Sequence, residues 1–161
     1  MSAKSAQVIS IHRVAVKDAP AEPLTEAQVR ANYGIEGDWR STSSRNRQVT
    51  LIEAEALEEV ARTLGREVKP GSSRRQVSVR GLPLNPTVGK VLRVGELELE
   101  VTGLCDPCDN MERTIGPGAR AALGDHGGIC ARVRKGGTLK VGDRVTVAEP
   151  VAEPVAEPVP A

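Results

Sequence analysis

The chain has 161 residues, 39% of them hydrophobic and 27% charged, with a net charge of +1 at neutral pH. This length allows one soluble domain with its own core, and no apolar run approaches the length of a membrane span. The balanced charge indicates no polyanionic partner, and a chain with one Trp, one Tyr and no Phe is poorly suited to stacking on nucleic-acid bases.

The first half of the chain alternates short strands with turns. Runs of β-branched residues predict strands over Gln7–Val16 and Arg47–Ile52. A helix should follow the second strand, because Thr50-Leu-Ile-Glu53 fits a capping box and apolar residues recur at helical spacing up to Leu64. Gly65 stands where a left-handed residue would end that helix.

The second half adds more strands and one further short helix, around Ala119–Leu123. The doublet Gly136-Gly137 predicts a hairpin between the last two strands. Many short strands with few helices indicate a mainly β fold, a closed or nearly closed β-barrel with one clear helix. The additional strands are predicted over Gln76–Val79, Val91–Val94, Leu97–Thr102, Ile129–Arg134 and Thr138–Val147.

The C-terminal segment is a simple repeat. Val-Ala-Glu-Pro occurs three times, at 147–150, 151–154 and 155–158. A proline at every fourth position removes backbone donors and prevents a helix, so the segment should be extended and disordered. We therefore predict one domain over residues 1–148 and a disordered tail over residues 149–161.

The cysteines are the most informative candidates for chemistry. Cys105-Asp-Pro-Cys108 follows an alternating strand and can bind a metal, cycle a disulfide, carry sulfur or merely pack. Together with His126 and Cys130 it formally matches a tetrahedral zinc site, while a thioredoxin-type redox pair would need a strand–helix–strand unit that the pattern does not reveal. We favour one functional thiolate, Cys108. Three cysteines and no apolar N-terminal run predict a cytoplasmic protein.

Several arginines flank the predicted strand ends in the first half, among them Arg47, Arg74 and Arg75. A guanidinium binds phosphate through two parallel hydrogen bonds, each contact being worth about 1.5–3 kcal/mol. A solvated, charge-balanced face is equally compatible with the pattern, since 21 acidic residues nearly match 22 basic ones.

Taken in order, a set of segments is more specific than any one of them. They are Gly34–Asp38, Arg47–Leu57, Pro70–Gly81, Leu84-Asn85, Val88-Gly89, Leu99–Cys108 and Gly127–Asp143. This ordered set, spanning about residues 7–147, resembles the MOSC domain. That domain forms the C-terminus of molybdenum-cofactor sulfurases and also exists as small standalone bacterial proteins.

The resemblance implies a β-strand-rich barrel and a link to the molybdenum cofactor, a pterin dithiolene with a terminal phosphate. It makes Cys108 the catalytic residue and the protein ligand to molybdenum. It places Arg74 in an Arg-x-Asn motif whose Asn is Gln76 here, which keeps the amide donors but shifts their reach. The cofactor-binding residues that it implies are Asp38, Arg47, Arg74, Arg75 and Gln76.

The function implied in this way is oxo transfer, as in the reduction of N-hydroxylated compounds, or sulfur transfer through a cysteine thiolate. Such a protein would act on a small molecule and depend on an electron-donor or sulfur-donor protein, because the chain shows no flavin or iron–sulfur signature. There are two alternatives: a non-catalytic carrier of sulfur or cofactor, or a structural module held together by zinc. Cys105 would then be an accessory or packing thiol, and Cys130 a core residue.

Overall fold

The computed structural model describes residues 6–43, 47–106 and 109–148. The predicted tail and Cys108 lie outside the described residues, so the division into domain and tail stays a prediction. None of the helices in these ranges is long and apolar enough to cross a membrane.

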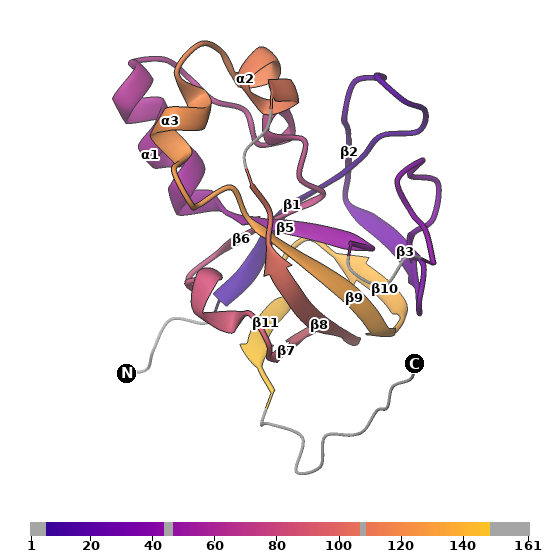
Figure 1. The fold of residues 1–161 in the computed structure, drawn as a ribbon. Helices are drawn as coiled ribbons and strands as arrows, with labels where there is room; N and C mark the ends of the chain where they lie inside the picture. Colours follow the sequence, from indigo (N-terminus) through magenta and orange to yellow (C-terminus); the bar gives the residue numbers. More distant parts are fainter. Residues whose placement is uncertain (1–5, 44–46, 107–108, 149–161) are drawn as a thin grey trace.

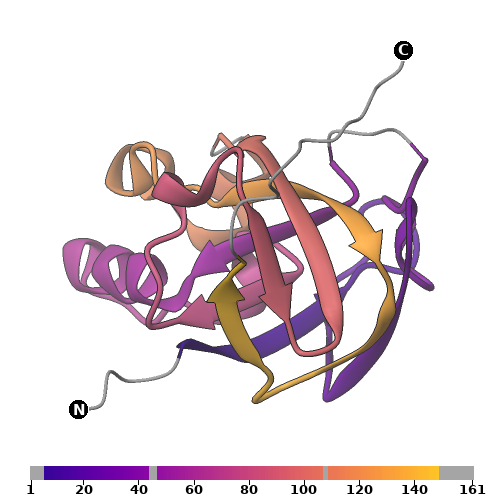
Figure 2. The ribbon, with the colours of Figure 1, turned by 90° about the horizontal axis from the view of Figure 1, so that it is seen from below.

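Seven strands close into a barrel, which confirms the predicted fold class. The bounds of these seven and of one added strand are β1 (Ala6–Arg13), β2 (Glu22–Leu24), β5 (Val49–Glu53), β6 (Val77–Arg80), β7 (Val91–Val94), β8 (Leu97–Leu104), β9 (Ile129–Lys135) and β11 (Arg144–Val147). The order is β11-β7-β8-β9-β5-β6-β1, an antiparallel pairing of β1 with β11 completes the ring, and β2 extends it beside β1. Figure 2 shows the strands around their core, with the helices to one side.

A small second sheet has the order β10-β3-β4, built from β3 (Glu26–Arg30), β4 (Gly34–Ile35) and β10 (Gly137–Lys140). The predicted hairpin at Gly136-Gly137 is wrong, because β10 pairs with β3 and not with β9. At Gly136 the chain crosses from one sheet to the other, and a Cβ there would lie 2.4 Å from the Val29 carbonyl oxygen. The glycine therefore serves a close backbone approach.

Three helices, α1 (Ala54–Leu64), α2 (Asp109–Ile115) and α3 (Ala119–Leu123), gather on one side of the barrel (Figure 1). The short helix predicted at α3 is confirmed, whereas α2 was not predicted. β5 and β6 are parallel and joined through α1, so the fold does contain a strand–helix–strand unit. The helices form a second core against the outer face of β5, made of Ile52, Leu57, Val60, Met111, Ile115, Ala119 and Leu123.

The predicted capping box is also wrong. Helix α1 begins at Ala54 after Glu53, which makes no side-chain cap hydrogen bond, and Thr50 lies within β5. The Thr50 hydroxyl instead accepts a hydrogen bond from the backbone N–H of Gln76 at 3.1 Å. The predicted end is confirmed, since Gly65 adopts the left-handed conformation with φ 68°.

The two faces of β5 have different neighbours. Val49 and Leu51 belong to the aliphatic core of the barrel, so the alternate residues Thr50 and Ile52 point outward. Thr50 is paired in register with Cys130 on β9, which puts the two side chains on the same outer face. The candidate site is built on this outer face.

Candidate functional site

A cavity of about 600 Å³ lies against the outer face of β5, beside the residue that precedes β6, within the usual size range of small-molecule sites. It brings together Arg47 and Gln76, two of the residues predicted to bind a cofactor. The full lining consists of Trp39, Arg40, Ser41, Thr42, Arg47, Gln48, Thr50 and Gln76.

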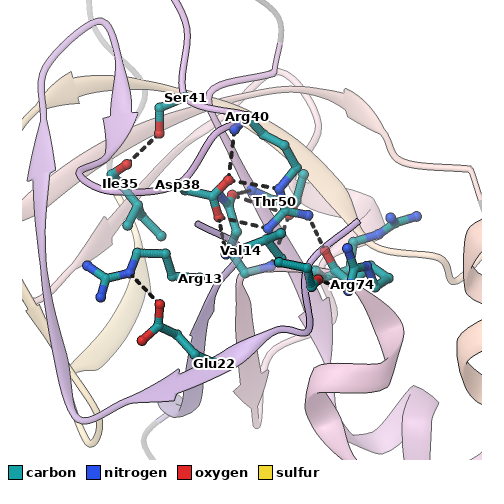
Figure 3. A network of polar contacts seen from close by, with 12 residues as sticks. Arg13, Val14, Glu22, Ile35, Asp38, Arg40, Ser41, Thr50 and Arg74 are labelled. Atoms are coloured by element: carbon teal, nitrogen blue, oxygen red, sulfur yellow. Dashed lines mark hydrogen bonds and ion pairs between the residues drawn. The ribbon is translucent and has the colours of Figure 1, made fainter. Parts of the chain in front are cut away.

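Asp38 supports the cavity from behind. Its carboxylate is fully buried and accepts hydrogen bonds from the backbone N–H of Val14 at 3.0 Å and from Arg40, whose Nε lies 2.9 Å and Nη2 2.8 Å away (Figure 3). Burial alone would raise the pKa of Asp38, but the hydrogen bonds and charge of Arg40 outweigh it and hold the pKa below the ordinary 3.8. The predicted residue Asp38 thus positions Arg40.

The guanidinium of Arg40 is part of this hydrogen-bond network. Its Nη1 donates to the backbone carbonyl of Arg74 at 2.6 Å, while the Asp38 carboxylate neutralises its charge. Arg47, by contrast, is exposed, and no acidic side chain among the described residues pairs with it. Arg47 therefore presents an exposed guanidinium to the cavity.

Gln76 is fixed by β5. Its Oε1 accepts a hydrogen bond from the Thr50 backbone N–H at 2.9 Å and a longer one, 3.4 Å, from the Thr50 hydroxyl. With the acceptor engaged, the amide nitrogen turns the other way, and no described residue accepts a hydrogen bond from it. Gln76 stands where the motif has Asn, and its amide nitrogen is therefore a hydrogen-bond donor whose direction is already set at the cavity wall.

Arg74 and Arg75 do not line the cavity. Arg74 has a left-handed backbone with φ 66°, and its Nη1 donates to the Ala19 carbonyl at 3.0 Å. Arg75 is 3% exposed and donates to the carbonyls of Gly127 at 2.6 Å and Asp106 at 2.9 Å. Arg75 thereby ties the end of β8 to the turn that precedes β9.

Cys105 and Cys130 form a buried thiol pair beside this clamp. A hydrogen bond from Cys130, with the charges of Arg75 and Arg47, lowers the pKa of Cys105 against the effect of burial. The same contact, together with burial, raises the pKa of Cys130. Cys105 is thus the more acidic thiol, a difference that the sequence did not reveal because it depends on contact between the residue that follows β8 and a residue of β9.

The described members of the predicted zinc set do not form a metal site. Within the described ranges, no three His, Cys, Asp or Glu residues are grouped so as to hold a metal ion. His126 is exposed, and its Nδ1 lies 2.9 Å from a carboxylate oxygen of Asp125. The fourth member, Cys108, lies outside the described residues.

The sequence profile of the MOSC domain matches residues 38–146. The chain belongs to the MOSC domain family. Membership is consistent with a domain that binds the molybdenum cofactor. A search of curated protein sequences found no match.

Solved structures share the MOSC fold at low sequence identity. The YuaD protein from Bacillus subtilis has a TM-score of 0.74 at 19% identity, covering 88% of this chain and 94% of that one. YiiM from Geobacillus stearothermophilus has a TM-score of 0.72 at 18% identity, covering 89% and 75%. YiiM from Escherichia coli has a TM-score of 0.66 at 18% identity, covering 90% and 71%. These likenesses show the fold.

Six lining residues were not predicted as site residues: Trp39, Arg40, Ser41, Thr42, Gln48 and Thr50. Trp39 carried a usable signal, because it is the only tryptophan of the chain and directly follows the segment Gly34–Asp38. Thr50 was placed in the predicted strand Arg47–Ile52, but its hydroxyl was interpreted as a helix cap, so its position in the cavity wall was not predicted.

Proposed function

We propose that this MOSC domain binds the molybdenum cofactor in the cavity on the outer face of β5. The observation that carries the proposal is the exposed guanidinium of Arg47, which no described acidic side chain pairs with, in a cavity of about 600 Å³. A terminal phosphate needs a cation and hydrogen-bond donors, and Arg47 and the fixed amide of Gln76 offer both. The chemistry of these donors fits the group.

In this proposal Arg47 binds the phosphate, Gln76 orients the ligand through its amide nitrogen, and Asp38 holds Arg40 in the wall. Cys108 provides the thiolate ligand to molybdenum, as the family resemblance implies. When bound, the cofactor supplies a metal centre that exchanges oxygen or sulfur atoms with a substrate. The activity we propose is reduction of an N-hydroxylated small molecule, with electrons from a donor protein.

A second candidate function is sulfur carriage, and the thiol pair favours it. Sulfur transfer needs a thiolate, because the thiolate is the nucleophile. Cys105 is the described thiol with a lowered pKa, held beside the buried cation of Arg75. In this version a sulfur-donor protein loads the domain, and the loaded sulfur passes to another enzyme.

The test is to purify the protein from a host that makes the cofactor and to measure molybdenum by elemental analysis and pterin by its fluorescent oxidation product. Arg47→Ala should reduce affinity about tenfold or more, from the 1.5–3 kcal/mol of a charge-assisted contact. Arg93→Ala is the control, because Arg93 is exposed on β7 and is not part of the lining. Equal loading of wild type and Arg47→Ala would place the phosphate elsewhere.

Substitution of each cysteine separates the two candidates. Cys108→Ala should remove molybdenum and leave the fold intact if oxo transfer is the function. Cys105→Ala should remove bound sulfane sulfur if sulfur carriage is the function. Zinc in the purified protein, with collapse of the fold in every cysteine variant, would instead support the zinc-stapled module.

A further inference from the structure

Trp39 is an exposed aromatic side chain in a chain that has almost none. The protein has one Trp, one Tyr and no Phe, and Trp39 is 47% exposed while it lines the cavity. The other aromatic residue is engaged elsewhere, since the guanidinium of Arg30 lies 4.9 Å from the centre of the Tyr33 ring. An exposed indole at a cavity wall is a surface for a ligand.

The backbone of Trp39 is fixed before any ligand arrives. Its N–H donates to the Val14 carbonyl at 2.9 Å. The residue before it, Asp38, is buried and accepts a hydrogen bond from the N–H of Val14, so two hydrogen bonds tie this short segment to Val14. The residue after it, Arg40, is held by the Asp38 carboxylate. A wall held in this way loses little conformational freedom on binding.

The polar groups of the cavity complement a flat, anionic molecule. Arg47 offers a cation, and Gln76 offers amide donors whose direction is set by Thr50. A ligand could place its anionic group at Arg47 and the acceptor atoms of its ring at Gln76. The face of its planar ring system would then still need a contact. Among the described lining residues, only Trp39 has an aromatic face.

We propose that Trp39 is the ring-binding wall of this cavity, stacking on the planar heterocycle of an anionic ligand whose acidic group is held by Arg47. This inference rests on the proposed function. It adds that Trp39 is the residue that selects a ligand with a flat ring. It makes Trp39 a specificity-determining residue: the cavity should prefer a pterin that carries an acidic group over the acidic group alone.

The experiment uses Trp39 fluorescence, which reports on this site alone because the chain has one tryptophan. The full-length protein is titrated with pterin-6-carboxylate and, separately, with inorganic phosphate. Pterin-6-carboxylate should quench the emission in a saturable way, whereas phosphate should leave it nearly unchanged and should compete with the pterin.

Variants test whether stacking contributes to affinity, with pterin-6-carboxylate binding measured by equilibrium dialysis. Trp39→Leu keeps an apolar side chain and should bind about tenfold more weakly, as expected for loss of one stacked ring. Trp39→Phe should restore much of the affinity. Tyr33→Leu is the matched control, since it removes the aromatic ring that lies outside the cavity lining.

The outcomes separate this inference from the proposed function. Saturable binding without quenching, or equal affinity of Trp39→Leu and wild type, would overturn the role of Trp39 and leave the cavity as a cofactor site. Failure of wild type to bind pterin-6-carboxylate would overturn the preference for a flat ring. Absence of molybdenum and pterin from the protein made in a cofactor-producing host would instead overturn the proposed function.

Discussion

The outer face of β5 has two ends that differ in what covers them. At Ile52 the three helices seal the strand under aliphatic side chains. At Thr50, two residues earlier on the same face, the neighbours are Gln76 and a polar cavity. One strand therefore carries a stabilising contact at one end and the proposed binding surface at the other, and substitutions at the two ends should affect different properties.

Substitution of Ile52, at the end of β5 that the helices cover, should have the largest effect on stability. Ile52→Ala removes a side chain that is 1% exposed and should lower the free energy of unfolding by about 2–5 kcal/mol, measured by urea denaturation. Ile52→Val is the control, with a cost of about 0.5–1.5 kcal/mol. Pterin binding by the folded fraction should be unchanged, and its loss in Ile52→Ala would show that the two ends are not separate.

Substitution of Asp38, which holds Arg40 in the cavity wall near Thr50, should have an intermediate effect on stability. Asp38→Asn keeps the shape but removes the charge that holds Arg40, and should cost about 1–3 kcal/mol at neutral pH. The folded pKa of Asp38 lies below 3.8, so this stabilisation is present above pH 3.8 and is lost as pH falls through the folded value. Urea denaturation at several pH values should show the difference between wild type and Asp38→Asn shrinking in acid. A difference independent of pH would exclude the charge as its cause.

The smallest effect on stability is expected at the thiol pair, where the readout is a pKa. Cys130→Ala removes the hydrogen-bond donor to Cys105 and should raise the pKa of Cys105. Cys130→Ser keeps a donor and should leave that pKa low. The carbon chemical shift of a labelled Cys105 β-carbon, followed against pH, measures both, and an unchanged midpoint in Cys130→Ala would assign the acidity to Arg75 and Arg47.

The sequence was most reliable for local patterns bounded by glycine. β7 and α3 lie at Val91–Val94 and Ala119–Leu123, where they were predicted, and a glycine directly follows each of them. It failed where a distant partner decides the structure. Thr50 looked like a helix cap, but its hydroxyl accepts a hydrogen bond from the backbone N–H of Gln76, 26 residues further along the chain.

At the candidate site, the types of the residues indicated which groups they could bind, but not which of them line the cavity and which hold other side chains in place. Arg47 and Gln76, which were predicted to bind a cofactor, both line the cavity, whereas Asp38 contacts Arg40. Arg75 resembles a phosphate ligand in sequence, yet its guanidinium is buried against backbone carbonyls. Which arginine stays free depends on tertiary neighbours far along the chain, and no local pattern records them.

The clamp at Arg75 has a consequence for how this domain can vary. The chain leaves β8 at Asp106 and returns to β9 at Gly127, and a single guanidinium holds both points. The segment between them, which carries α2 and α3, is therefore an insert with a common anchor at its two ends. Arg75 fixes the two ends of this insert, while Met111, Ile115 and Leu123 within it belong to the core that covers β5, so a change in its length must preserve both the anchor and that packing.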